Sequence, residues 1–252
     1  MFVFNISRTK IIFVFSILII WGIFCGTRTV LVNRADMAIP LEKVETDQKV
    51  IALTFNVDWG EEYIIPILDV LETKKVEATF FVTGKWAEKN SELVKTIAEQ
   101  GHEVENHGYS HSHPDRDSLE KTKDEIIRTE NIINNIINRK TVFFAPPYGE
   151  RGTNGLKAAQ ELNYEYVLWT LDTIDWHPQS TVESIINRIA NPKIVNGVKL
   201  DRKGAIVLMH PKANTVKALP AIIDDLVNDG FSFNTLQKLI TFDMTGNTTS
   251  EQ

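Results

Sequence analysis

The sequence predicts an α/β fold in which seven strands and their helices form a distorted β/α barrel. Two observations carry this prediction. Strand-like and helix-like stretches alternate from about residue 50 to about residue 240. In addition, the stretches at 51–55 and 206–209 are apolar without interruption, which is typical of parallel strands that are buried on both faces.

Seven stretches are predicted as strands from this alternation. They cover residues 50–56, 78–83, 103–107, 142–145, 166–170, 205–210 and 231–235. The segments between them have helical periodicity and an apolar face that can cover a sheet. These predicted helices cover residues 64–74, 92–100, 119–137, 155–162, 182–189 and 219–229.

The N-terminus resembles an export signal. Arg8 and Lys10 precede an apolar run at 11–25, and a positive flank of this kind stays on the cytoplasmic side of a membrane. The run has the length of a signal-peptide core, but Phe24 stands where cleavage requires a small residue, which favours an uncleaved anchor. If the segment is cleaved, the protein is secreted.

The pattern therefore predicts four regions along the chain. They are a signal-anchor or transmembrane segment at 1–26, a linker at 27–48, a catalytic domain at 49–240 and a flexible tail at 241–252.

Composition excludes some classes of partner and site. A net charge of −6 gives no electrostatic reason to expect a nucleic-acid partner, because phosphate binding needs clustered Lys and Arg. Cys25 is the single cysteine, so neither an intrachain disulfide nor a cysteine zinc cluster can form. A metal ion would have to be bound by His and carboxylate side chains.

Polar and aromatic clusters follow the ends of the predicted strands. The clusters are Asn56 with Asp58, His107 with His111, Pro146 to Tyr148, Asp172 to Trp176, and His210. In a β/α barrel the carboxyl ends of the strands face one common mouth, so these residues are expected to converge there.

His107 and His111 form a possible metal site. Their spacing allows both imidazoles to reach one ion, and two His plus one carboxylate leave positions open for water and substrate. Asp58 is the predicted third ligand. Alternatively, the pair consists of ordinary polar loop residues. The remaining histidines, His102, His113 and His177, are expected on the surface or in support of the site.

In order, these clusters resemble the five motifs of the polysaccharide deacetylase family, also called carbohydrate esterase family 4 or the NodB-homology domain. The stretches are 54–60 (TFNVDWG), 106–111 (NHGYSH), 144–149 (FAPPYG), 172–176 (DTIDW) and 208–210 (LMH). The resemblance covers about residues 50–240 and implies the distorted seven-stranded barrel of that family. The pattern is similar to the sporulation-type deacetylase-like proteins of Gram-positive bacteria.

The resemblance implies hydrolysis of an acetamide at a divalent metal, with Zn expected and Co, Ni or Mn as alternatives. Asp58, His107 and His111 match the metal ligands, and His210 matches the acid that protonates the departing amine. Asp175 matches the carboxylate partner of that His, although it could instead cap a helix.

The substrate is expected to contact five further positions. They are Asn56, Pro147, Tyr148 through its backbone N–H, Trp176 and Tyr109. For the aromatic residues, packing inside the barrel is the alternative.

Two positions depart from the family pattern. The family has two consecutive Asp in its first motif, a base followed by a ligand, whereas this chain has Asn56, Val57 and then Asp58. Its third motif begins with an Arg that orients the base, and Ala145 stands there. Asn cannot act as a general base, and without the Asp a buried guanidinium would have no partner. Asp58 then binds the metal, acts as the base, or alternates between these roles.

The resemblance thus predicts an enzyme that removes N-acetyl groups from amino-sugar polymers, such as peptidoglycan or chitin-like oligomers, outside the membrane. The alternative is a catalytically weakened relative that binds glycan or metal in the cell envelope or during sporulation. The expected partners are a glycan with N-acetylhexosamine units and the membrane, through the N-terminal segment. A monomer is expected.

Overall fold

The computed structural model describes residues 39–192, 194–195 and 198–245. The chain divides into two compact units, 1–36 and 37–252, and every described residue belongs to the second. The predicted anchor, most of the predicted linker and the end of the predicted tail lie outside the described residues. Within the described ranges, no helix is both long enough and apolar enough to cross a membrane.

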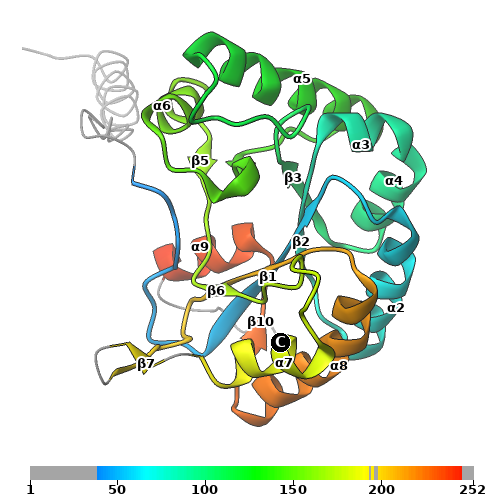
Figure 1. Ribbon diagram of the computed structural model, residues 1–252, viewed down its shortest axis with the longest axis vertical. Coiled ribbons are helices and arrows are strands. Elements are labelled where there is room, and N and C mark those ends of the chain that lie inside the picture. Colours follow the sequence, from blue (N-terminus) through cyan, green and yellow to red (C-terminus); the bar gives the residue numbers. More distant parts are fainter. Residues whose placement is uncertain (1–38, 193, 196–197, 246–252) are drawn as a thin grey trace, which may run out of the picture. The chain divides into compact units, whose positions relative to one another are not determined.

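Seven parallel strands form the sheet, as predicted, in the order β5-β4-β3-β2-β1-β9-β6 (Figure 1). They are β1 (Val50–Val57), β2 (Thr79–Val82), β3 (Glu103–Asn106), β4 (Phe143–Phe144), β5 (Glu165–Tyr166), β6 (Leu171–Asp172) and β9 (Ile206–Met209). A short β10 (Ser232–Phe233) pairs with the start of β1, and β7 (Ile194–Val195) pairs with β8 (Val198–Lys199) in a separate antiparallel hairpin.

Helices surround these strands. They are α2 (Ile64–Lys74), α3 (Gly84–Lys89), α4 (Ser91–Glu99), α5 (Leu119–Ile137), α6 (Thr153–Glu161), α7 (Val182–Ala190), α8 (Ala213–Asn228) and α9 (Leu236–Thr245), with 3-10 turns η1 (Glu61–Tyr63) and η2 (Pro147–Gly149). All six predicted helices are confirmed, and α2 and α5 have the predicted bounds. The sequence did not predict α3 or α9.

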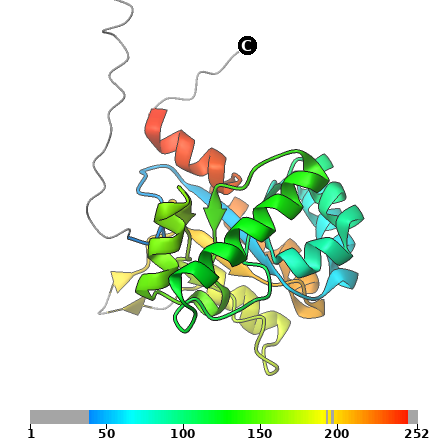
Figure 2. The same ribbon diagram turned by 90° about the horizontal axis from the view of Figure 1, so that it is seen from above.

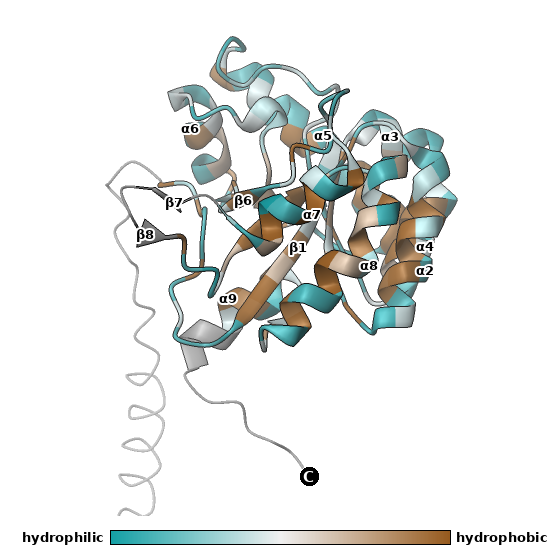
Figure 3. Cartoon of the chain, turned by 60° about the horizontal axis from the view of Figure 1, so that its bottom comes forward, coloured by the Kyte–Doolittle hydropathy of each residue, from teal (hydrophilic) through white to brown (hydrophobic). Residues whose placement is uncertain are grey.

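Strand β1 explains the uninterrupted apolar run. Its odd-numbered residues, from Ile51 to Val57, pack with the helices on the outside of the sheet, and its first even-numbered residues, Val50 and Ala52, pack inside the barrel. Figure 3 shows apolar residues along β1 and on α2, α4 and α8. Because side chains alternate along a strand, Asn56 continues the inward series and reaches the carboxyl end of the barrel.

The opposite, amino end of the strands is covered by α9, which is red in Figure 2. Leu236 and Leu239 pack into the barrel interior. The Leu236 N–H donates to the hydroxyl of Thr79 (2.9 Å), and the Gln237 N–H donates to the carboxylate of Glu103 (3.3 Å). The helix continues to Thr245, beyond the predicted start of the tail at 241.

The predicted strand at 166–170 is wrong beyond Tyr166. Strand β5 ends at Tyr166, and β6 begins at Leu171. Between them, the Leu168 N–H donates to the Leu41 carbonyl, and the Leu41 N–H donates to the Tyr166 carbonyl. The segment from Leu41 to Val44, predicted as linker, therefore packs against the barrel as part of the domain.

Candidate active site

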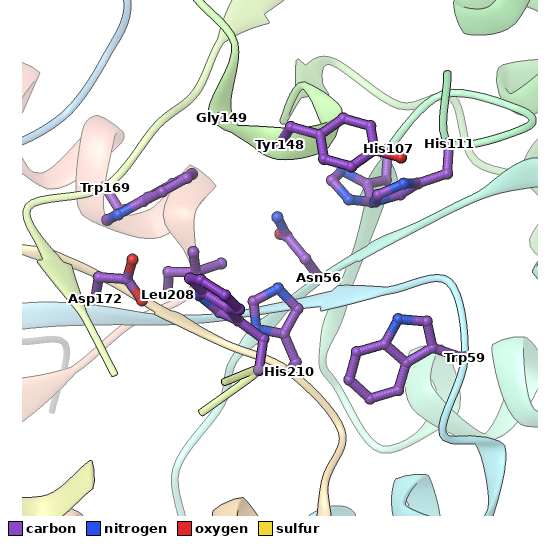
Figure 4. A pocket seen from close by; sticks show the side chains of 11 residues that line it. Asn56, Trp59, His107, His111, Tyr148, Gly149, Trp169, Asp172, Leu208 and His210 are labelled. Atoms are coloured by element: carbon purple, nitrogen blue, oxygen red, sulfur yellow. The ribbon is translucent and has the colours of Figure 1, made fainter. Parts of the chain in front are cut away.

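A cavity of about 480 Å³ opens at the carboxyl ends of the strands (Figure 4). It is lined by Asn56, Trp59, His107, His111, Tyr148, Gly149, Trp169, Asp172, Trp176, Leu208 and His210. These residues follow or end β1, β3, β4, β5, β6 and β9, so segments separated by about 150 positions converge as expected. Six of the predicted site residues lie in the lining: Asn56, His107, His111, Tyr148, Trp176 and His210.

His107 is oriented by the backbone of Ala145, directly after β4. Its Nδ1 lies 2.7 Å from the carbonyl oxygen of Ala145, which can only accept a hydrogen bond, so Nδ1 carries the proton. The other ring nitrogen, Nε2, is then free to bind a ligand. Burial, with 2% of the residue exposed, lowers the pKa of His107 well below its usual value. The ring is therefore neutral, which is the form that binds metals.

His111 lies beside His107, with ring centroids 5.1 Å apart. Burial lowers the pKa of His111 as well, opposed by the charge of Asp58. The loop that carries His111 is held by Glu125 of α5, whose carboxylate accepts hydrogen bonds from the backbone N–H groups of Tyr109 (2.9 Å) and Ser110 (2.6 Å). These bonds fix the loop at the mouth of the barrel.

Asp58 is not in the cavity lining. Its Oδ1 accepts a hydrogen bond from the Thr83 hydroxyl (2.8 Å), which also caps α3. Across the ranges that the structure describes, no three His, Cys, Asp or Glu side chains come close enough together to hold a metal ion. His107 and His111 thus fit a transition metal as a pair, but the predicted carboxylate ligand does not join them in this arrangement.

His210 lies across Asn56 from His107 and His111 (Figure 4). Asp175 holds its ring by a hydrogen bond. Asp175 is 3% exposed, and its Oδ1 lies 2.8 Å from Nδ1 of His210. Its Oδ2 accepts from the His210 backbone N–H and from the hydroxyl of Thr215, both at 2.7 Å. Asp175 therefore fixes the side chain and the backbone of His210 together, which is more than helix capping requires.

Aromatic side chains form much of the cavity wall. Trp59, Tyr148 and Trp176 keep 39%, 58% and 47% of their surface exposed. The Trp59 ring lies parallel to that of His210, with centroids 6.0 Å apart. Trp169 packs against Gly149, where no Cβ would fit. Such partly exposed rings suit stacking against a sugar face.

The structure does not bring every predicted residue to the cavity. Tyr109 points elsewhere: its hydroxyl donates to Glu88 (3.0 Å), and the Arg128 guanidinium lies 3.5 Å from its ring centre. Pro147 is buried and is not among the lining residues. Sequence reasoning missed Trp59, Trp169 and Leu208 as wall residues. The signal for Trp59 was its place directly after Asp58, at the end of the first motif.

The two departures from the family pattern occupy different environments. Asn56 lines the cavity and is 7% exposed, so the expected position of a base is filled by an amide. Ala145 is 4% exposed and packs inside the barrel. Among the described lining residues, Asp172 is the one with a carboxylic side chain. Burial raises its pKa, and its Oδ1 accepts a hydrogen bond from the Ile174 N–H.

Known proteins of one family are similar to this chain. The family model for polysaccharide deacetylase matches residues 43–167. A peptidoglycan-N-acetylglucosamine deacetylase of Bacillus cereus is 33% identical over 206 residues, which cover 79% of this chain and 92% of that protein. The chain belongs to the polysaccharide deacetylase family.

Two further proteins are similar to this chain. The uncharacterized protein YlxY of Bacillus subtilis is 34% identical over 201 residues, which cover 80% of this chain and 60% of YlxY. The crystal structure of BA3943, a CE4 family pseudoenzyme from Bacillus anthracis, has a TM-score of 0.74 and 33% identity over 80% of this chain and 69% of BA3943. A BA3943 mutant with restored enzymatic activity has the same TM-score of 0.74.

Proposed function

We propose that this polysaccharide deacetylase family member is a metal-dependent hydrolase that removes N-acetyl groups from amino-sugar polymers such as peptidoglycan. The observation that carries the proposal is one cavity with two neutral imidazoles, His107 and His111, on one side and His210, bound to Asp175, on the other. The similarity to a peptidoglycan-N-acetylglucosamine deacetylase supports a peptidoglycan-type substrate.

Each histidine of the cavity has a proposed role. His107 and His111 would hold the metal, with Asp58 as the predicted third ligand and Zn as the expected ion. When bound, a Zn ion supplies a Lewis acid for the acetyl carbonyl and lowers the pKa of a water molecule. His210 delivers a proton to the departing amine nitrogen, because its Nδ1 is held by Asp175 and Nε2 remains for the substrate.

The wall would select a sugar. Trp59 and Trp176 offer exposed ring faces on which a hexosamine can stack. The Tyr148 backbone N–H is proposed to donate to the oxygen that becomes negative when the acetyl carbon is attacked. Asn56, between the two sets of histidines, can donate a hydrogen bond to the acetamide but cannot accept a proton from water.

A second candidate function is glycan or metal binding in the cell envelope, including during sporulation, with little or no turnover. Asn56 and Ala145 favour this candidate because they replace the base and the residue that orients it. Similarity to BA3943, described as a pseudoenzyme, points the same way.

Acetate release separates the two candidates. The full chain is incubated with N-acetylglucosamine oligomers and with peptidoglycan, with and without added zinc or cobalt. Metal-stimulated acetate release that is lost in a His107→Ala, His111→Ala double variant is expected. Glycan binding without acetate release under any metal would favour the second candidate. Failure of zinc to bind to the wild-type chain would remove the basis of the hydrolase proposal.

We further propose that the domain lies outside the cytoplasmic membrane, held by residues 1–26. Protease added to intact spheroplasts should digest the domain while a cytoplasmic control protein survives. Survival of both would count against export.

A further inference from the structure

We propose that His113, bound to Glu150, is a positioning residue that holds Tyr148 in place and, through Tyr148, the imidazole of His111. The consequence for turnover rests on the function proposed above. The arrangement itself does not, because it follows from contacts among the four side chains.

Three aromatic rings form one continuous stack at the edge of the cavity. The imidazole of His113 lies parallel to the ring of Tyr148, with centroids 3.8 Å apart and planes 5° from parallel. The His111 ring contacts the Tyr148 ring edge-on, with centroids 4.7 Å apart. Tyr148 is thus held between one ring inside the site and one outside it.

Glu150 fixes the outer ring of this stack. Its Oε1 lies 2.6 Å from Nδ1 of His113, and its Oε2 accepts the backbone N–H of Asp115 at 2.7 Å. The Glu150 carbonyl accepts a hydrogen bond from the hydroxyl of Tyr166 (2.7 Å), a residue of β5. His113 is therefore linked through Glu150 to the Asp115 backbone and to the sheet.

The backbone explains why such support is needed. Both His111 (φ 54°) and Tyr148 (φ 62°) are in the left-handed region, which is unfavourable for residues with a side chain. Residues in this conformation persist where surrounding contacts hold them, and they concentrate at functional sites. The rings of His111 and Tyr148 contact each other, so loss of the stack would allow both loops to relax.

Two substitutions of His113 separate the ring from its hydrogen bond. His113→Asn retains a side-chain donor for Glu150 but removes the ring, whereas His113→Phe retains the ring and removes the donor. Glu161→Gln is a matched control, because Glu161 also forms ion pairs, but with Lys123 (2.8 Å) and Lys157 (3.8 Å), which are not part of the stack.

The first measurement is hydrogen–deuterium exchange in the metal-free full chain, followed in peptides that cover residues 144–152. Exchange there should accelerate in His113→Asn, less in His113→Phe, and not in the control. The second is zinc affinity together with kcat and KM for acetate release. For His113→Asn we expect kcat and zinc affinity to fall roughly 10- to 100-fold, as for residues that orient a ligand from behind, with KM little changed.

The outcomes keep the two proposals apart. Wild-type exchange and wild-type zinc affinity in His113→Asn would overturn the positioning role, whether or not the chain releases acetate. Faster exchange and weaker zinc binding in a chain that never releases acetate would retain the positioning role and remove the hydrolase. Equal losses in His113→Asn and His113→Phe would overturn the role of the ring. If the Asn variant fails to fold, Glu150→Gln, which leaves all three rings in place, is measured in the same way.

Discussion

At the scale of single residues, substitution of Asp175 tests whether His210 acts as the acid. Its two oxygens serve three donors: the His210 ring, the His210 backbone and the Thr215 hydroxyl. Asp175→Asn replaces one acceptor oxygen with an NH₂ group that would face a donor. We expect the turnover number to fall by about 10²- to 10⁴-fold, the usual range for a positioned acid or base.

The control for that variant is Thr215→Val, which removes a single hydrogen bond from Asp175 and leaves His210 bound. A smaller loss of turnover is expected. Acetate release measured across pH compares the two variants. Equal turnover in Asp175→Asn and the wild type would mean that His210 is not the acid.

Asn56 allows a test in which a substitution is expected to increase turnover. A carboxylate at position 56 would lie in the cavity wall, where the amide now stands, and could accept a proton from water. Asn56→Asp is therefore expected to increase turnover, by up to about 10²- to 10⁴-fold. Ala145→Arg is the natural second change, but Ala145 packs inside the barrel, so its guanidinium must reach the cavity to orient the new acid.

The readout for Asn56→Asp is the pH–rate profile at equal metal content. A fall in activity with a shifted pH optimum would indicate that Asp58 already acts as the base, because two nearby carboxylates titrate as a coupled pair. An unchanged profile would contradict the assignment of position 56 to the reacting cavity.

How far the site could be predicted from sequence depended on the kind of contact. His107, His111 and His210 follow strands, so the fold class alone placed them at one mouth. The orientation of Asp58 depends on a hydrogen bond with Thr83, 25 positions later, and the role of Ala145 lies in its carbonyl oxygen. No side-chain pattern reports either contact.

At the scale of elements, helix α5 supports the loop that carries His111. Glu125 is 3% exposed and accepts two backbone N–H groups, the Ser110 hydroxyl and the Lys121 ammonium. Glu125→Gln should reduce the free energy of unfolding by about 1.5–3 kcal/mol, the usual contribution of hydrogen bonds to a charged group. It should also weaken zinc binding at His111.

Chemical denaturation measures the first effect, and Glu120→Gln is the control on the same helix. Glu120 is 80% exposed at its side chain and lies 3.5 Å from Lys123, so its removal should have almost no effect. A Glu125→Gln protein as stable as that control would show that the loop does not depend on α5.

The elements predicted best were long and amphipathic. Helices α2 and α5 have apolar positions at helical spacing and were predicted to the residue. Helix α3, with six residues, is too short to show a helical period in its apolar residues, and its start depends on Thr83 as a cap. The predicted strand at 166–170 failed for a tertiary reason, because Leu41 pairs with that segment and separates β5 from β6.

At the scale of the whole molecule, a buried acid links stability to pH. Burial and the neighbouring Glu103 raise the pKa of Glu105 to about 8, although Arg139 lies 2.7 Å away. Because the folded-state pKa is above the ordinary value, the contribution of Glu105 to stability is present below about pH 4.5 and is lost as the pH rises through about 8.

We expect the free energy of unfolding to decline between pH 5 and 8 less steeply in Glu105→Gln than in the wild type, since Gln does not ionise. Urea titrations at several pH values measure this difference, and Glu120→Gln should follow the wild type. Parallel curves for Glu105→Gln and the wild type would place the pH dependence elsewhere.

The central position of β1 has a consequence for how the chain folds. It is the first strand along the described part of the chain, yet the Thr54 hydroxyl donates to the carbonyl of Val207, 153 residues later, and β10 pairs with its first residues. Until β9 is available, one edge and much of the apolar surface of β1 lack their partners. Contacts so distant in sequence slow folding. The chain would therefore stay unfolded through most of its synthesis, in a form that can still be threaded across a membrane, and pulse proteolysis of chains ending before β9 should show no protected core.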